Sequence, residues 1–161
     1  MRPQYEIPLI YTSKGAEETS ALGEQLAPLL EKGGIVALRG PLGAGKTCFI
    51  KGIARGLGIE EEITSATYTI ISEYEGTIPA EGKACPVYHI DAYRLRGNDD
   101  FSAIGGEEIV FGDGISLIEW SERIGDFISP EAIQVTIEIK GNGERLIRIY
   151  REGKLLPGEG E

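Results

Sequence analysis

The segment from Gly40 to Thr47 combines glycines, one lysine and one threonine at a spacing suited to binding a polyphosphate. It reads G-P-L-G-A-G-K-T and fits the pattern G-x-x-x-x-G-K-[ST] at every fixed position. The glycines let the backbone curl so that several N–H groups point at one polyphosphate. We expect Lys46 to reach the β- and γ-phosphates, and the Thr47 hydroxyl to bind the Mg²⁺ that bridges them. The residues expected to contact the nucleotide here are Pro41, Leu42, Gly43, Ala44, Gly45, Lys46, Thr47 and Cys48.

A strand before this segment and a helix after it would provide the context that a phosphate-binding loop needs. Ile35 to Leu38 is a short apolar run typical of a buried parallel strand. After the loop, apolar residues recur along one face of a helix, and Gly58 suits the helix end. That face consists of Phe49, Ile50, Ile53, Ala54 and Leu57. An ordinary glycine-rich turn is the alternative interpretation, and the agreement between the segment and its flanks argues against it.

Acidic residues end two other predicted strands. A site for phosphoryl transfer needs carboxylates to hold Mg²⁺, usually through water, and to orient the nucleophile. Glu119 ends the apolar run that starts at Ile115, and Asp91 ends the run that starts at Val87. Each carboxylate has an alternative role, in which it caps a helix or pairs with a nearby arginine.

Four further side chains each have two interpretations. Thr67 and Thr69 lie in a hydroxyl-rich segment that either senses a γ-phosphate, as switch loops do, or simply favours a strand. Trp120 either belongs to the core or lines the nucleotide pocket. His89, in the interior of a predicted strand, is interpreted as a core or supporting residue rather than as a base.

The rest of the chain predicts an α/β domain around the phosphate-binding strand. The other expected elements are a strand at 6–11, a helix from Gly15 that bends or ends at Pro28, strands at 67–74, 87–92 and 115–120, a loop at 76–84 and a short helix within 96–108. Isoleucines alternate with polar residues around Gly141-Asn142-Gly143, which predicts an antiparallel hairpin. We expect a P-loop NTPase-type three-layer fold, with helices on both faces of a central mixed sheet and this hairpin at an antiparallel edge.

Composition predicts one soluble domain, at residues 1–153, followed by a flexible tail at 154–161. The net charge of −10 argues against direct binding of free nucleic acid, because such binding depends on neutralising phosphates. The sequence has no apolar stretch of ~20 residues and no apolar signal core, so we expect a cytoplasmic protein without membrane association. Cys48 and Cys85 have no metal or redox spacing and are expected to be reduced thiols.

The motifs together resemble the TsaE (YjeE) family of small bacterial P-loop ATPases. Beside the P-loop, the chain has S-A-T-Y-T at 65–69, H-I-D-A-Y-R-L at 89–95 and E-W-S-E-R at 119–123, in the order of the family's motifs. The N-K-x-D segment with which GTPases read guanine does not occur, which favours adenine. Ala66 stands where the family usually has proline.

The resemblance implies an ATPase that is needed for making N6-threonylcarbamoyladenosine in tRNA. In that family the ATPase works with the TsaD and TsaB subunits and drives turnover of their complex, so tRNA contact is indirect. Its ATP hydrolysis is weak until the partners bind.

Combining motif and resemblance, we expect Lys46 to bind the phosphates, Thr47 and Glu119 to hold Mg²⁺ or its water shell, and Asp91 to orient or deprotonate the attacking water. The sequence does not decide which of Asp91 and Glu119 holds the cation and which orients the water, so the two roles could be exchanged. Thr67 or Thr69 would report the γ-phosphate, and Trp120 matches a family position tied to activity.

Two other functions are compatible with the same residues. A small-molecule or nucleotide kinase would use Asp91 as base for a substrate hydroxyl and would transfer phosphate to an acceptor. A nucleotide-dependent binding module would use ATP to tighten a partner interface, without meaningful turnover.

Overall fold

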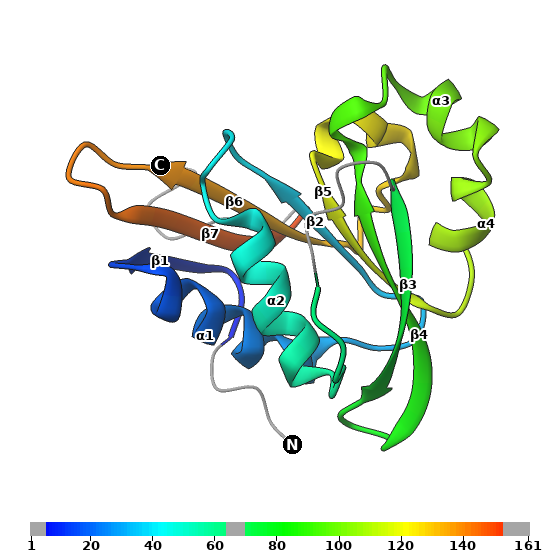
Figure 1. Cartoon of the computed structure of the whole chain (residues 1–161), viewed down its shortest axis with the longest axis horizontal. Helices are drawn as coiled ribbons and strands as arrows, with labels where there is room; N and C mark the ends of the chain where they lie inside the picture. The colour runs from blue at the N-terminus through cyan, green and yellow to red at the C-terminus, as the bar shows by residue number, and fades with distance from the viewer. Residues whose placement is uncertain (1–5, 64–69, 153–161) are drawn as a thin grey trace.

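The computed structural model describes residues 6–63 and 70–152 (Figure 1). Its strands form a seven-stranded sheet in the order β1-β7-β6-β2-β5-β4-β3. The strands are β1 (Leu9–Ser13), β2 (Ile35–Arg39), β3 (Ile71–Ile78), β4 (Lys83–Asp91), β5 (Ile115–Glu119), β6 (Ile133–Ile139) and β7 (Arg145–Arg151). The α-helices are α1 (Ala16–Leu26), α2 (Lys46–Gly56), α3 (Asn98–Ala103) and α4 (Gly106–Val110), and the 3₁₀ helices are η1 (Ala27–Leu29), η2 (Ala92–Arg94) and η3 (Ser121–Phe127).

Four parallel strands form the centre of the sheet. β2 pairs in parallel with β5 on one side and β6 on the other, and β4 pairs in parallel with β5. Every residue of β5 and the first four of β2 are buried. Both strands are therefore apolar without alternation, as expected where helices cover both faces of a parallel sheet.

Helices lie on both faces of the sheet. Side chains that alternate along the central strands enter two different clusters, because successive residues of a strand point to opposite faces. Val36 and Leu117 pack with α1 and α2, whereas Ile35 and Ile118 pack with α3, α4 and η3. The expected three-layer α/β fold, with a mixed sheet and helices on both faces, is thereby confirmed.

Two glycines let α1 lie against α2 at very short range. A Cβ on Gly52 would lie 1.9 Å from the carbonyl oxygen of Ser20, and one on Gly23 would lie 2.2 Å from that of Phe49. No other residue fits at either position without moving a helix backbone. This contact fixes the direction of α2, which begins at Lys46, near the end of the glycine-rich segment 40–47.

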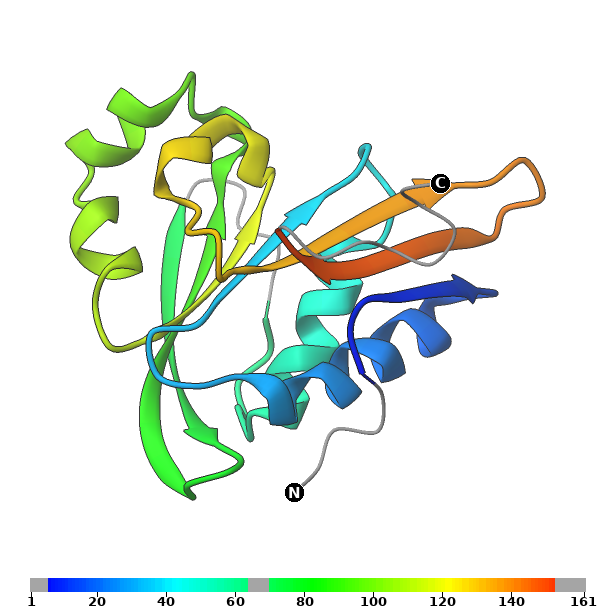
Figure 2. The ribbon, with the colours of Figure 1, turned by 180° about the vertical axis from the view of Figure 1, so that it is seen from behind.

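The C-terminal hairpin is confirmed, but its predicted place at the edge of the sheet is wrong. β6 and β7 pair antiparallel, and β7 also pairs antiparallel with β1. Figure 2 shows β1, in dark blue, beside β7, in orange-red. The N-terminal strand therefore covers the outer side of the hairpin, a long-range pairing that local sequence patterns do not report.

The loop predicted at 76–84 is also wrong, because most of this segment is paired. β3 continues through Ile78, and β4 begins at Lys83. Gly76 allows a close approach of chains: a Cβ there would lie 2.9 Å from Val87 Cγ2 and 3.2 Å from Leu57 O. In this strand glycine marks a close contact, and not a loop.

Other boundaries differ less. The first strand is Leu9–Ser13 and not 6–11, and the region 96–108 contains all of α3 and the first part of α4, separated at Gly105. The helix expected from Gly15 is α1, which ends before Pro28 in η1. Within the described ranges, no helix is long and apolar enough to cross a membrane. The expected tail at 154–161 and the first part of the strand predicted at 67–74 lie outside the described residues.

Candidate functional site

The segment between β2 and α2 forms a tight loop whose conformation requires glycine. Gly43 and Gly45 have φ values of 79° and 107°, in the left-handed region that favours glycine. The Ala44 N–H donates to the Pro41 carbonyl at 3.1 Å, which closes the loop on itself. Helix α2 begins at Lys46, so the positive end of its dipole faces the loop.

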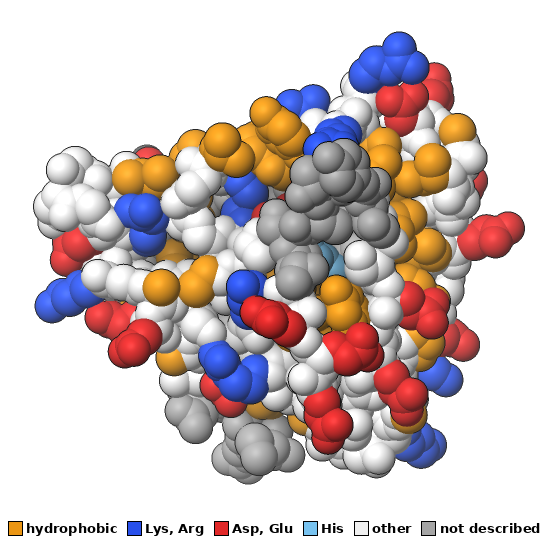
Figure 3. Space-filling view, viewed as in Figure 1, with side chains coloured by type: hydrophobic (Ala, Val, Ile, Leu, Met, Phe, Trp, Pro, Cys, Tyr) orange, Lys and Arg blue, Asp and Glu red, His pale blue; other side chains and the backbone are white. Residues whose placement is uncertain are grey.

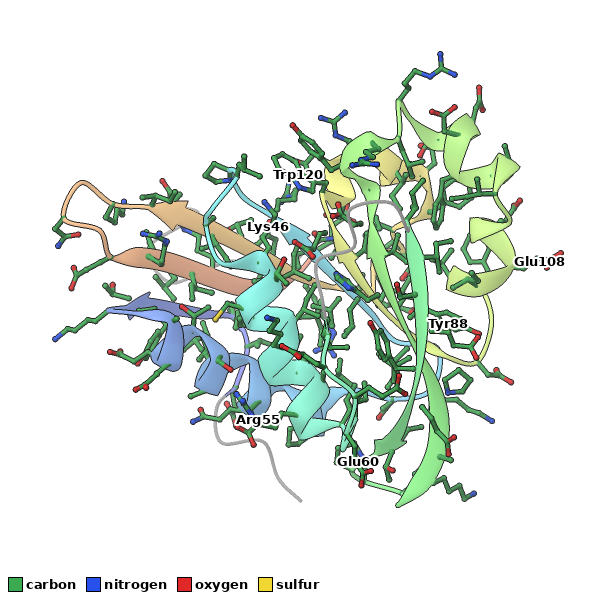
Figure 4. The ribbon with its side chains drawn as sticks, viewed as in Figure 1. Lys46, Arg55, Glu60, Tyr88, Glu108 and Trp120 are labelled. Atoms are coloured by element: carbon green, nitrogen blue, oxygen red, sulfur yellow. The ribbon has the colours of Figure 1, made fainter. Side chains whose placement is uncertain are left out.

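Lys46 is folded back into the loop. Its ammonium group donates to the carbonyl oxygen of Pro41 at 3.1 Å and to that of Gly40. The same group lies 3.9 Å from the centre of the Trp120 ring, and Figure 4 shows the two labelled residues close to each other. Burial lowers the pKa of Lys46, and the negative charge of Glu119 opposes that shift.

A chain of three polar side chains connects α2 to the two strands beside it. The Thr47 hydroxyl lies 3.0 and 3.1 Å from the two carboxylate oxygens of Glu119, and one of these oxygens lies 2.7 Å from His89 Nε2. Glu119 and His89 are 4% and 2% exposed. In Figure 3 the histidine is visible as a small pale-blue area. The carboxylate is thus held between a hydroxyl at the helix start and an imidazole on β4.

The donor set formed by Thr47 and Glu119 fits Mg²⁺. A hydroxyl and a carboxylate are hard oxygen ligands, and this ion commonly binds to one or two carboxylates plus water and substrate phosphates. Both groups lie beside Lys46, so a cation held by them would be adjacent to the loop between β2 and α2.

Trp120 has an unusual backbone conformation that directs its ring at the loop. Its φ of 57° and ψ of 41° are left-handed, which is uncommon for a bulky residue and costs of order 1 kcal/mol or more. Its ring lies 4.9 Å from that of Tyr93, and the Arg123 guanidinium lies 5.8 Å away. The sequence leaves Trp120 either in the core or beside the nucleotide pocket, and its contact with Lys46 favours the position beside the loop.

The other predicted site residues occupy different positions. Asp91 ends β4, one strand further from the loop than Glu119, and one of its carboxylate oxygens accepts from the Tyr93 N–H at 3.1 Å. The Cys48 thiol donates to the Ala16 carbonyl of α1 at 3.2 Å, so its side chain points away from the loop. Leu42 is 77% exposed at the tip of the loop. Thr67 and Thr69 lie outside the described residues.

Several side chains at the site were not assigned a role from the sequence. Ser121 donates to the Leu38 carbonyl at 3.3 Å and joins the end of β2 to the segment after β5. Tyr93 and Arg123 lie within the motifs at 89–95 and 119–123, and that position is the signal that points to them. Arg145, from β7, also contacts the loop, and nothing in its local sequence indicates this.

Comparison with known proteins finds consistent matches. The family described as "Threonylcarbamoyl adenosine biosynthesis protein TsaE" matches residues 13–147. A tRNA threonylcarbamoyladenosine biosynthesis protein TsaE from Treponema pallidum is 41% identical over 85% of this chain and 96% of that protein. Its namesake from Bacillus subtilis is 39% identical over 85% of this chain and 82% of that protein. The crystal structure of Bacillus subtilis YdiB superposes with a TM-score of 0.69 at 36% identity, covering 90% of this chain and 86% of that one.

Proposed function

The chain belongs to the TsaE family of threonylcarbamoyl adenosine biosynthesis proteins, and we propose that it is the Mg²⁺-dependent ATPase of that process. On this proposal it binds ATP at the loop between β2 and α2 and hydrolyses it to ADP and phosphate. The partner proteins expected from the family resemblance are the TsaD and TsaB subunits. In the cytoplasm, the cycle of ATP binding and hydrolysis would drive turnover of their complex.

The contact between Thr47 and Glu119 is the observation that carries this proposal. It places an acidic group from the strand beside β2 at the first turn of α2, next to Lys46. A glycine-rich turn with a structural role needs no buried carboxylate at this point, and a buried carboxylate is costly to desolvate. A nucleotide site with a cation requires one.

Lys46 and the loop backbone would bind the phosphates of ATP. Lys46 now donates to the Gly40 and Pro41 carbonyls, and it would exchange these contacts for phosphate oxygens. Because an ammonium group binds an anionic oxygen more strongly than a neutral carbonyl, the exchange favours the bound state. Trp120 covers Lys46 on one side and would limit the access of water to it.

Thr47 and Glu119 are the residues that would hold the cation. When bound, Mg²⁺ neutralises charge on the phosphates as the terminal bond breaks. The imidazole of His89 fixes the orientation of the Glu119 carboxylate. Asp91 lies one strand further from the loop, and one of its carboxylate oxygens accepts from the Tyr93 N–H. We therefore assign Glu119 to the cation and Asp91 to orienting the attacking water.

Hydrolysis measured with and without partners tests the proposal. We expect the purified chain to release phosphate from ATP slowly, and faster with the TsaB–TsaD pair. Lys46→Ala should abolish the activity, whereas Lys51→Ala, an exposed lysine on the same helix, should leave it intact. Activity that does not respond to the pair would contradict the assigned role in the complex.

The same assay separates the two alternative functions. Phosphate transferred to a small acceptor, instead of released, would identify a kinase. If a variant that binds ATP without hydrolysing it still supports tRNA modification, the chain is a nucleotide-dependent binding module.

A further inference from the structure

The guanidinium of Arg145 contacts the phosphate-binding loop from β7. Its Nε donates to the Ala44 carbonyl at 3.1 Å, and its Nη2 donates to the Gly43 carbonyl at 3.3 Å. Its Nη1 donates to the Gly143 carbonyl in the β6–β7 turn at 2.7 Å. One side chain therefore joins two loops that lie about 100 residues apart in the sequence.

The carbonyls that Arg145 holds determine where the loop's N–H groups point. In a planar trans peptide, the C=O of one residue and the N–H of the next point in opposite directions. The Gly43 carbonyl and the Ala44 N–H form one such peptide, and the Ala44 carbonyl and the Gly45 N–H form the next. The Ala44 N–H is indeed directed across the loop to Pro41, away from Arg145.

We propose that Arg145 is a positioning residue for nucleotide binding: it fixes the two peptide planes after Gly43 and Ala44, so that the Ala44 N–H closes the loop on Pro41 and the Gly45 N–H faces the phosphates. The inference rests on the proposed function, because it assumes that the loop binds a nucleotide. Without such a contact the loop would sample many conformations, since glycine restricts the backbone least. Because Arg145 already orders the loop in the free protein, nucleotide binding costs less conformational entropy of the loop.

The fork of the guanidinium is essential to this role. Two nitrogens of one rigid plane contact two consecutive carbonyls, whereas a lysine ammonium is a point charge on a flexible stem. Arg145→Lys therefore keeps the charge and loses the paired geometry. Arg148, on the same strand, is a matched control, because it pairs with Glu138 and not with the loop.

The test measures ADP binding by calorimetry together with thermal unfolding without nucleotide. We expect Arg145→Ala to weaken ADP binding about tenfold, which corresponds to the cost of ordering about one loop residue on binding, and Arg145→Lys to weaken it by less. Arg148→Ala should change the Kd less than twofold. A purely structural role would lower the Tm and leave the Kd of the folded protein unchanged.

The outcomes distinguish this inference from the proposed function. If the unaltered protein binds ADP and folded Arg145→Ala binds it equally well, Arg145 has no positioning role and the proposed function stands. If Arg145→Ala does not fold, an unchanged Kd for Arg145→Lys overturns the inference in the same way. If the unaltered protein binds neither ADP nor ATP, both ideas are wrong.

Discussion

His89 Nε2 lies 2.7 Å from Glu119 Oε2, and both side chains are almost fully buried. The same carboxylate accepts a hydrogen bond from the Thr47 hydroxyl. Strands β4 and β5 and the first turn of α2 therefore meet at this one group. A buried carboxylate with these contacts has little rotational freedom. Its orientation at the loop is therefore set by the protein before any ligand binds.

Replacing His89 should raise the Mg²⁺ requirement without removing the proposed activity. We expect His89→Ala to increase the Mg²⁺ concentration for half-maximal hydrolysis roughly 10–100-fold, because the carboxylate loses its orienting partner. Saturating Mg²⁺ should restore much of the rate. Glu119→Ala should abolish hydrolysis at every Mg²⁺ concentration, and His89→Gln, which keeps an N–H donor, should lie near the unaltered protein. An unchanged Mg²⁺ requirement in His89→Ala would show that the contact has no positioning role.

Nucleotide binding should change the fluorescence of Trp120. This residue is the chain's one tryptophan, and the Lys46 ammonium lies 3.9 Å from its ring. If Lys46 turns toward phosphates, the charge beside the indole moves and the emission changes. A titration with ADP, read at the tryptophan emission, measures this; Lys51→Ala should respond like the unaltered protein. Emission that stays constant while calorimetry records binding would mean that Lys46 does not leave the ring.

ADP affinity should fall at alkaline pH. The fall should begin at a lower pH than it would if Lys46 had the pKa of an ordinary lysine. Burial lowers the pKa of Lys46 because it disfavours the charged form. The neutral amine cannot attract phosphate, so affinity is present below this pKa and is lost as the pH rises through it, by up to about tenfold per pH unit. Calorimetry at a series of pH values from about 7 to about 10, below and up to the ordinary lysine pKa, measures the loss. Lys46→Arg should bind ADP with little pH dependence over this interval, and a flat profile for the unaltered protein would contradict the prediction.

Gly52→Ala should destabilise the fold by about 1–3 kcal/mol, because the added Cβ overpacks the α1–α2 contact. The Cβ would lie 1.9 Å from a backbone oxygen, so a helix must move. Gly125→Ala is the matched control, since nothing lies within 4 Å of its Cβ position, and we expect a change within about 0.5 kcal/mol. Urea unfolding of both variants gives the comparison. Equal midpoints for the two would show that the helices adjust at no cost.

Strand β2, the glycine-rich loop after it and helix α2 could be predicted because their signals are local. The apolar run from Ile35, the glycines of the loop and the apolar face of α2 all lie within about 25 residues of sequence. The meeting of Glu119 with Thr47 also follows from a simple rule, since carboxyl ends of neighbouring parallel strands lie at the same edge of a sheet. What this rule does not provide is the strand order, which puts Glu119 on the strand beside β2 and Asp91 one strand further away.

The features that sequence patterns missed depend on contacts between distant segments. The place of β1 beside β7 and the contact of Arg145 with the loop each join residues about 100 or more positions apart in the sequence. Gly76 was misinterpreted because glycine has the same local signature in a loop as in a tightly packed strand. These cases require knowledge of the neighbours that the fold supplies.

The pairing of β1 with β7 has a consequence for synthesis of the protein. β1 emerges early from the ribosome, and its hydrogen-bonding partner is the last strand of the described chain to be made. Until then the N-terminal strand has an open edge, and the loop lacks the arginine that β7 brings to it. Folding during translation therefore stops short of the native sheet until β7 has left the ribosome, and the nascent chain acquires its ordered loop only then.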